Sequence, residues 1–129
     1  MNIELQMLIW SIALGLVQAA IAATGMTGQR GLGWAASARD GTPTAMTGVS
    51  GRLERARANL LETFVFFAAA VLAGYVLQRH TAMTVLGAQL YFWSRLVYVP
   101  IYALGIPYVR TLVWTVSMVG IVLLLIPLF

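Results

Sequence analysis

Long apolar segments constrain the fold of this chain more than any other feature of its sequence. Four of them cover about residues 3–24, 51–78, 82–103 and 108–128. A helix of roughly 20 apolar residues crosses the hydrocarbon core of a bilayer, and it satisfies its own backbone hydrogen bonds, as lipid requires. The turns between the last three segments are short, so neighbouring helices run antiparallel. The sequence therefore predicts an all-α fold, an integral membrane four-helix bundle.

Composition supports the membrane assignment. The 129 residues form one domain, of which 60% are hydrophobic and 9% charged, whereas soluble domains have about 45–50% apolar and about 25% charged residues. The chain has no cysteine, which excludes a disulfide framework and a protein thiolate. A single histidine, His80, argues against a histidine metal site, so we predict no metal. His80 falls in the turn between the second and third segments, where we expect it to be solvated.

The formal net charge of +4 is carried by arginines that lie beside apolar spans, which favours membrane topology over nucleic-acid binding as its explanation. The side of the membrane that faces away from most of these arginines would carry only Arg79. We therefore expect both termini outside and the loops 25–50 and 104–107 in the cytoplasm. The first loop is rich in Gly, Thr and Ser, which predicts turns and no helix. Most of the positive charge precedes or opens the second helix: Arg30, Arg39, Arg52, Arg55 and Arg57.

The second helix carries polar residues from its start into an apolar segment. At about 100° per residue, Arg52, Arg55, Asn59 and Glu62 fall on one stripe, whereas Arg57 lies off it. A charged side chain inside hydrocarbon costs about 2.5–3.5 kcal/mol on insertion scales. We therefore expect partners or a function to hold Glu62 in place.

A second stripe occurs on the third helix, where Tyr91, Arg95, Tyr98 and Tyr102 recur at helical spacing. An unpaired guanidinium would be costly in the middle of this segment, so we predict a bidentate ion pair between Arg95 and the Glu62 carboxylate. Two interpretations are open. The stripes are polar contacts that join the helices, or the positive charge left over after one such pair indicates a bound anion.

Both stripes belong to longer motifs. Segment 55–62, Arg-Ala-Arg-Ala-Asn-Leu-Leu-Glu, resembles a signature of the MAPEG superfamily, the membrane-associated proteins in eicosanoid and glutathione metabolism. Segment 91–102, followed by Gly105, Pro107 and Arg110, resembles a second block of that family. The resemblance extends from the start of the second helix to the C-terminus. It is closest to the small bacterial members, which implies a bacterial inner membrane.

The resemblance implies a homotrimer that binds glutathione, as co-substrate, between subunits near the cytoplasmic face. Hydrophobic small-molecule substrates would enter from the membrane lipid. Arg110 matches the arginine beside the thiol in family enzymes, where it would be the catalytic residue that stabilises the thiolate. Arg57 and Thr63 depart from the pattern of some members, so leukotriene- or prostaglandin-type specificity is not implied. Matching positions give the glutathione-binding residues: Arg52, Arg55, Asn59, Glu62, Arg95, Tyr98 and Tyr102.

Three functions fit these residues. The motifs favour an enzyme, a glutathione-dependent membrane transferase or peroxidase acting on hydrophobic electrophiles. A non-catalytic lipid- or ligand-binding membrane protein of the same fold would use the same arginines for an anionic headgroup or a fatty acid. A small transporter with Glu62 as its coupling carboxylate is the third, although inward-facing arginines do not favour a cation carrier. Glutathione binding by the purified protein separates the first function from the others.

Overall fold

The computed structural model describes residues 2–41, 43 and 45–129, and the regular elements in these ranges are all helical. The prediction of an all-α protein is thus confirmed over the part of the chain that is described. The helices follow in the order α1 (Asn2–Arg30), α2 (Leu32–Ala36), α3 (Gly48–Val76), α4 (Ala82–Ala103) and α5 (Val109–Leu125), and a 3₁₀ turn, η1 (Ile126–Leu128), ends the chain.

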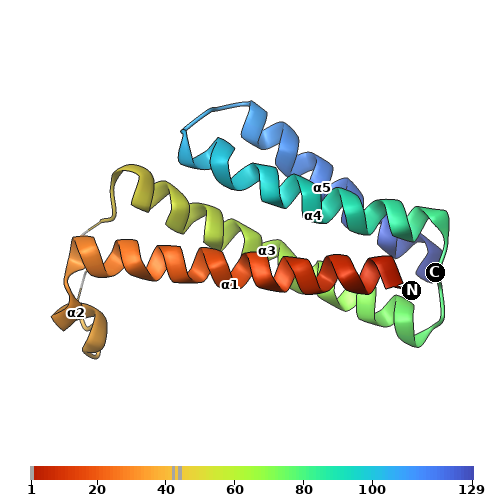
Figure 1. Ribbon diagram of the computed structural model, residues 1–129, viewed down its shortest axis with the longest axis horizontal. Helices are drawn as coiled ribbons and strands as arrows, with labels where there is room; N and C mark the ends of the chain where they lie inside the picture. Colours follow the sequence, from red (N-terminus) through yellow and green to blue (C-terminus); the bar gives the residue numbers. More distant parts are fainter. Residues whose placement is uncertain (1, 42, 44) are drawn as a thin grey trace.

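The long helices run side by side, α1 next to α3 and α4 next to α5 (Figure 1). Both termini and the α3–α4 turn lie at one end of the molecule, called here the terminal end. The short helix α2 and the α4–α5 connection lie at the other, called the α2 end. The arginine-rich start of α3 is also at the α2 end, so most of the positive charge is separated from the termini along the long axis.

Among the described helices, α1, α3 and the last one, Val109–Leu128, are long and apolar enough to cross a membrane. Helix α4 has 22 residues, but its Gln, Trp, Tyr and Arg side chains make it less apolar than the others. Its polar residues Thr84, Ser94 and Arg95 are buried against the other helices. Large apolar side chains are exposed along α1, α3 and α5, as expected for helices whose outer faces contact lipid.

Helices α4 and α5 approach each other through two glycines. A Cβ atom on Gly87 would lie 2.5 Å from the Gly120 carbonyl oxygen, and one on Gly120 would lie 2.6 Å from that of Gly87. Small residues permit this backbone contact, which is the usual way for membrane helices to gain packing energy. The core next to it is apolar and aromatic: Leu60, Phe67, Val71, Ala88, Tyr91 and Leu124.

The predicted loop at 25–50 is wrong in part, because α1 continues to Arg30 and α2 occupies Leu32–Ala36. Tertiary contacts with α3 hold the extra turns of α1 in place. The Gln29 carboxamide donates to the Thr47 carbonyl at 2.8 Å and accepts from the Thr47 N–H at 2.9 Å. A Cβ atom on Gly25 would lie 2.9 Å from the Ser50 hydroxyl, so this glycine serves close helix packing and does not break the helix.

The other helix ends follow local turn chemistry. Helix α3 ends at Val76, two residues before the predicted end, because Gln78 adopts a left-handed conformation with φ 57°. The Arg79 N–H then bonds the Gly74 carbonyl at 2.9 Å, as in a Schellman motif. Helix α4 spans Ala82–Ala103, the range expected from the sequence. The last predicted helix, 108–128, ends earlier as an α-helix because Pro127 lies in the 3₁₀ turn.

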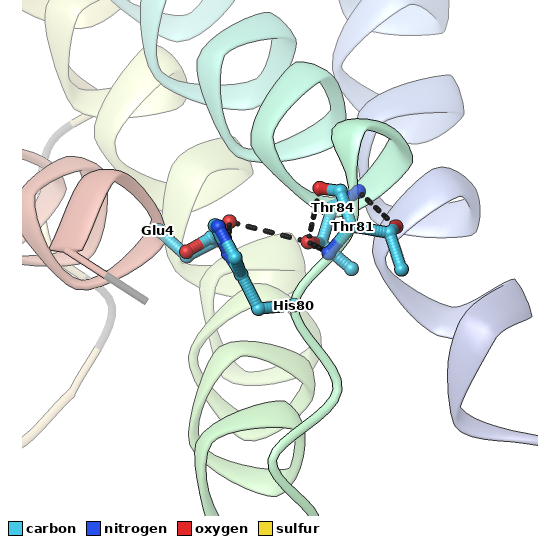
Figure 2. Close-up of polar contacts among 4 residues, drawn as sticks. All are labelled: Glu4, His80, Thr81 and Thr84. Carbon is cyan, nitrogen blue, oxygen red and sulfur yellow. Dashed lines mark hydrogen bonds and ion pairs between the residues drawn. The ribbon is translucent and has the colours of Figure 1, made fainter.

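A buried carboxylate joins three elements at the terminal end (Figure 2). Glu4 on α1 is fully buried, and its Oε1 atom lies 2.8 Å from His80 Nδ1 and 3.1 Å from the Thr84 hydroxyl. Thr84 also forms a capping box with Thr81 at the start of α4. His80 is half-exposed and contacts Glu4, so the expectation of a solvated histidine holds only in part.

Replacing Glu4 with alanine is expected to lower the free energy of unfolding by about 1–3 kcal/mol, because it removes hydrogen bonds to a charged group and leaves His80 and Thr84 without their partner. The measurement is denaturant unfolding of the purified protein in detergent, followed by circular dichroism. Gln6→Ala is the matched control, since Gln6 is exposed on the same turn of α1. Equal stabilities of the two variants would show that the contact does not fasten the elements together.

Candidate functional site

A pocket of about 270 Å³ opens at the α2 end, between the start of α3 and the α4–α5 connection. Three arginines contribute to its wall, Arg52 and Arg55 from α3 and Arg110 from α5. Tyr102 and the connecting residues 105–107 complete it. Three cationic side chains from two helices therefore converge on one space, and none of the residues that line it is acidic.

Tyr102 organises these arginines. Its ring lies 4.8 Å from the Arg110 guanidinium carbon and 6.0 Å from that of Arg55. Both distances are within the range of cation–π attraction. Arg52 is held differently, since its Nε donates to the carbonyl of Ala103 at the end of α4, at 2.8 Å. The three cations are therefore positioned by α4 as well as by their own helices.

The α4–α5 connection places Arg110 opposite α3. The Ile106 N–H bonds the Ile101 carbonyl at 3.2 Å, and Gly105 has φ +71°, as a Schellman ending requires. Glycine adopts this conformation at no steric cost. The chain then turns directly into α5, so that Arg110 lies in its first turn.

A second pocket of about 180 Å³ lies next to the first and is lined by Asn59, Tyr98, Arg110, Thr111 and Trp114. Arg110 lines both pockets. Its guanidinium is therefore at the junction of a strongly cationic space and a more neutral, partly aromatic one.

Arg95 lies behind the second pocket, with 1% of its surface exposed. Its Nη2 donates to Asn59 Oδ1 at 2.8 Å, and its guanidinium carbon is 4.5 Å from the centre of the Tyr98 ring. The Nε and Nη1 atoms are buried without a hydrogen-bond partner among the described residues. A buried guanidinium with unused donors strongly favours an anion or acceptor nearby.

The predicted ion pair between Glu62 and Arg95 is wrong. Asn59 is the partner of Arg95, and Glu62 is exposed and lines neither pocket. The buried side of α3 runs through Leu60, Thr63 and Phe67. Glu62 lies outside that side, next to the exposed Leu61.

Two pocket residues were not predicted from the sequence, and one residue of the predicted stripe lies elsewhere. Thr111 and Trp114 line the second pocket, but they belong to an apolar helix whose sequence gives no polar stripe apart from Arg110. Tyr91 stacks on Phe67 at 4.0 Å and shares a hydrogen bond of 3.1 Å with the Thr63 hydroxyl. The first tyrosine of the predicted stripe is therefore packed in the core, and Tyr98 and Tyr102 are the ones that reach the pockets.

The chemistry of these walls suits an elongated acidic ligand. Guanidinium groups bind carboxylates through charge-assisted hydrogen bonds, and aromatic rings with an asparagine offer contacts to a peptide-like chain. Within the described residues, no group of three or more His, Cys, Asp or Glu side chains could hold a metal ion. Three guanidinium groups on one pocket can hold an organic anion by electrostatic attraction.

The sequence was compared with known proteins. A model of the MAPEG family matches residues 7–129, nearly the whole chain. Searches of the curated proteins and of the solved structures returned no match. The apolar helices described above agree with the family assignment, because its members are membrane proteins. The chain belongs to the MAPEG family, and it is an integral membrane protein of this family of eicosanoid and glutathione metabolism.

Proposed function

We propose that the protein is a glutathione-dependent membrane transferase or peroxidase that acts on hydrophobic electrophiles. The observation that carries the proposal is the convergence of Arg52, Arg55 and Arg110 on one pocket, with Arg110 shared by a second, more neutral pocket. Glutathione has two carboxylates, one ammonium group and a thiol. One carboxylate end would lie at Arg52 and Arg55, the other end at Asn59 and Tyr98, and the thiol beside Arg110.

In this proposal the binding residues divide by position. Arg52, Arg55 and Tyr102 would hold one end of the tripeptide, and Asn59 and Tyr98 the other. Arg95 would hold Asn59 and Tyr98 in position from their buried side, and its Nε and Nη1 donors lie next to these two residues. The proposed glutathione-binding residues are all those that the motifs imply. They include Glu62, which lies outside the two pockets.

Arg110 would be the catalytic residue. A guanidinium beside the thiol favours its ionised form, and lowering a thiol pKa by about 2 units corresponds to roughly 2.7 kcal/mol. The thiolate would attack the electrophilic carbon to form the new S–C bond, and the leaving group would depart with the bonding electron pair. The thiol proton would pass to solvent. The substrate would reach the site from the lipid, as the exposed apolar faces of the helices allow.

A non-catalytic ligand-binding protein of the same fold is the second candidate, and the position of Glu62 favours it. Neither pocket is lined by an acidic residue, so within one chain nothing complements the ammonium group of glutathione. A fatty acid or another anion without an ammonium group would not need that contact. In the homotrimer that we propose, the exposed Glu62 could instead face a ligand held by a neighbouring copy.

Glutathione titration of the purified protein in detergent, followed by calorimetry, tests the proposal. Arg55→Ala is expected to weaken binding about 10-fold, the effect of one charge-assisted hydrogen bond. Arg55 is the cleaner choice because it is exposed, whereas Asn59→Ala would also leave buried Arg95 without its partner. Arg57→Ala is the matched control, since Arg57 lies on the same helix, lines neither pocket and pairs with Glu54.

Two outcomes of this titration decide between the candidates. If Glu62→Gln weakens glutathione binding but not the binding of a simple fatty acid, the ammonium contact is real and the first candidate stands. If glutathione does not bind and a fatty acid does, the second candidate replaces it. Unchanged glutathione affinity in Arg55→Ala would overturn the assignment of the site.

We also propose the orientation that places the α2 end, with both pockets, on the cytoplasmic side of a bacterial inner membrane. The separation of the arginine-rich α2 end from the terminal end supports it, since cytoplasmic loops carry an excess of positive charge.

A further inference from the structure

The connection between α4 and α5 turns at Tyr108 in a conformation that a tyrosine rarely adopts. The backbone angles of Tyr108 are φ 60° and ψ −54°, and the Val109 N–H bonds the carbonyl of Pro107. These angles and this bond define the strained form of the γ-turn, the rare mirror image of the common inverse γ-turn. A bulky residue with positive φ is an outlier, and such residues are concentrated at ligand clamps and switch regions.

The side chain of Tyr108 does nothing to offset this strain. Tyr108 is 87% exposed, and its hydroxyl has no hydrogen-bond partner within the described part of the chain. Gln78 offers a comparison, because it also has positive φ. It lies where α3 ends in a Schellman motif, and a left-handed residue is usual there. Tyr108 begins α5 and has no such explanation.

Tyr108 lies between two residues of the candidate site. Pro107 lines the first pocket, and Arg110 lines both pockets. Tyr108 itself lines neither. The strain is therefore in the wall of the site, whereas the side chain of the strained residue lies outside it.

A less strained conformation is available to the same turn. The inverse γ-turn, with φ about −75° and ψ about +65°, is closed by the same type of hydrogen bond. The turn can therefore pass from one form to the other while the Val109 N–H keeps the Pro107 carbonyl as its partner. Because the two forms are mirror images, this change carries the Cβ atom of Tyr108 to the opposite face of the turn. The ring then moves from the solvent side toward the pocket side.

We propose that Tyr108 is a clamp for the ligand of the first pocket, an inference that rests on the proposed binding of glutathione there. Without ligand, the strained turn holds the ring away and leaves the pocket open. When the ligand binds, the turn relaxes to its inverse form and the ring closes over the carboxylate held by Arg52 and Arg55. Exclusion of water strengthens these charge-assisted hydrogen bonds. The ring contact and the release of strain therefore both raise the affinity.

Three substitutions of Tyr108 separate the ring from the strain. Tyr108→Phe keeps both and should bind glutathione as the unaltered protein does. Tyr108→Ala keeps the strained backbone but lacks the ring, so its affinity should fall about 5-fold. Tyr108→Gly lacks both, because glycine adopts positive φ at no steric cost, and its affinity should fall about a further 5-fold. Calorimetric titration of the full-length protein in detergent measures all three.

Thermal unfolding without ligand tests the strain by itself. Tyr108→Gly should raise the Tm by about 3 °C, whereas Tyr108→Ala and Tyr108→Phe should stay close to the unaltered protein. Gln78→Gly is the matched control, since Gln78 has positive φ at the terminal end, far from both pockets. It should leave the affinity for glutathione unchanged.

Three results would overturn the clamp. Unchanged affinity in Tyr108→Ala would make the ring an ordinary aromatic group of the membrane interface. Equal affinities of Tyr108→Ala and Tyr108→Gly would show that binding releases no strain. A Tm of Tyr108→Gly at or below that of the unaltered protein would show that the turn stores none. If the unaltered protein does not bind glutathione, the proposed function fails, and titration of the same variants with dodecanoate, a simple fatty acid, tests the clamp separately.

Discussion

Arg110→Gln is expected to lower turnover with glutathione about 100-fold near neutral pH while changing glutathione affinity much less. Arg110 lines the junction of the two pockets, where the thiol would lie, whereas Arg52 and Arg55 remain to bind one carboxylate end. Loss of a thiol pKa shift of about 2 units reduces the thiolate fraction about 100-fold, or roughly 2.7 kcal/mol. Glutamine removes the charge and keeps a polar side chain that can still donate hydrogen bonds.

Arg110→Gln is also expected to shift the pH dependence of turnover. In the unaltered protein the thiolate would form at lower pH, so the rate should reach its plateau earlier as pH rises. In Arg110→Gln the plateau should move to higher pH by about 2 units, and the deficit should shrink there. Turnover and the ultraviolet absorbance of the thiolate, each followed across pH, are the two measurements.

Arg79→Gln is the control for Arg110→Gln, because Arg79 lies at the terminal end, where its guanidinium donates to the carbonyl of Pro127, far from both pockets. An Arg110→Gln protein with normal turnover and a normal pH profile would remove Arg110 from the catalytic step. A variant that loses affinity and turnover together would make Arg110 a binding residue instead.

Gly120→Ala is expected to have the largest effect on stability. The added Cβ would lie 2.6 Å from the Gly87 carbonyl oxygen and 2.9 Å from the Tyr91 nitrogen, and backbone atoms cannot rotate out of the way. Helices α4 and α5 would have to separate, which disturbs the wall that carries Tyr98 and Arg110. Overpacking of this kind costs about 1–3 kcal/mol and occasionally more, and we expect the upper end of that range.

Gly28→Ala is the control, because its expected change in stability has the opposite sign. A Cβ atom at Gly28 would meet no atom within 4 Å, and the residue lies inside α1. Alanine is favoured over glycine in a helix by about 0.8–1.0 kcal/mol, so this variant should be slightly more stable. Thermal unfolding in detergent compares both variants with the unaltered protein. Equal stability of the Gly120 variant and the unaltered protein would contradict the close approach of α4 and α5.

Helical periodicity located the four long helices and placed Arg52, Arg55, Tyr98 and Tyr102 on common faces, whereas Arg110 was assigned from the family resemblance. Helical spacing also explains why the predicted ion pair between Glu62 and Arg95 is wrong. Although Glu62 follows Asn59 by three residues, it lies about 60° further round the helix, whereas Thr63 lies about 40° to the other side. The packing of α3 selects the side of Asn59 and Thr63, and no property of α3 alone could indicate that choice.

Other features depend on contacts between distant segments, which periodicity does not report. The last turns of α1 are held by Gln29 and Thr47, so a glycine-rich sequence is helical where a loop was predicted. Thr111 and Trp114 line a pocket with Asn59 and Tyr98 because α5 packs closely on α4, where Gly120 approaches Gly87. Such residues become visible only once the helices are placed together.

The buried Glu4 carboxylate has a consequence for the order in which the protein assembles. Glu4 and its partner His80 are 76 residues apart in the chain, so the ribosome delivers the acid long before the histidine and threonine that match it. The first helix is therefore made before either partner of Glu4, and this contact can form only after the α3–α4 turn has been made. Synthesis from the N-terminus thus makes the fastening of the start of α1 to the start of α4 a late event in assembly.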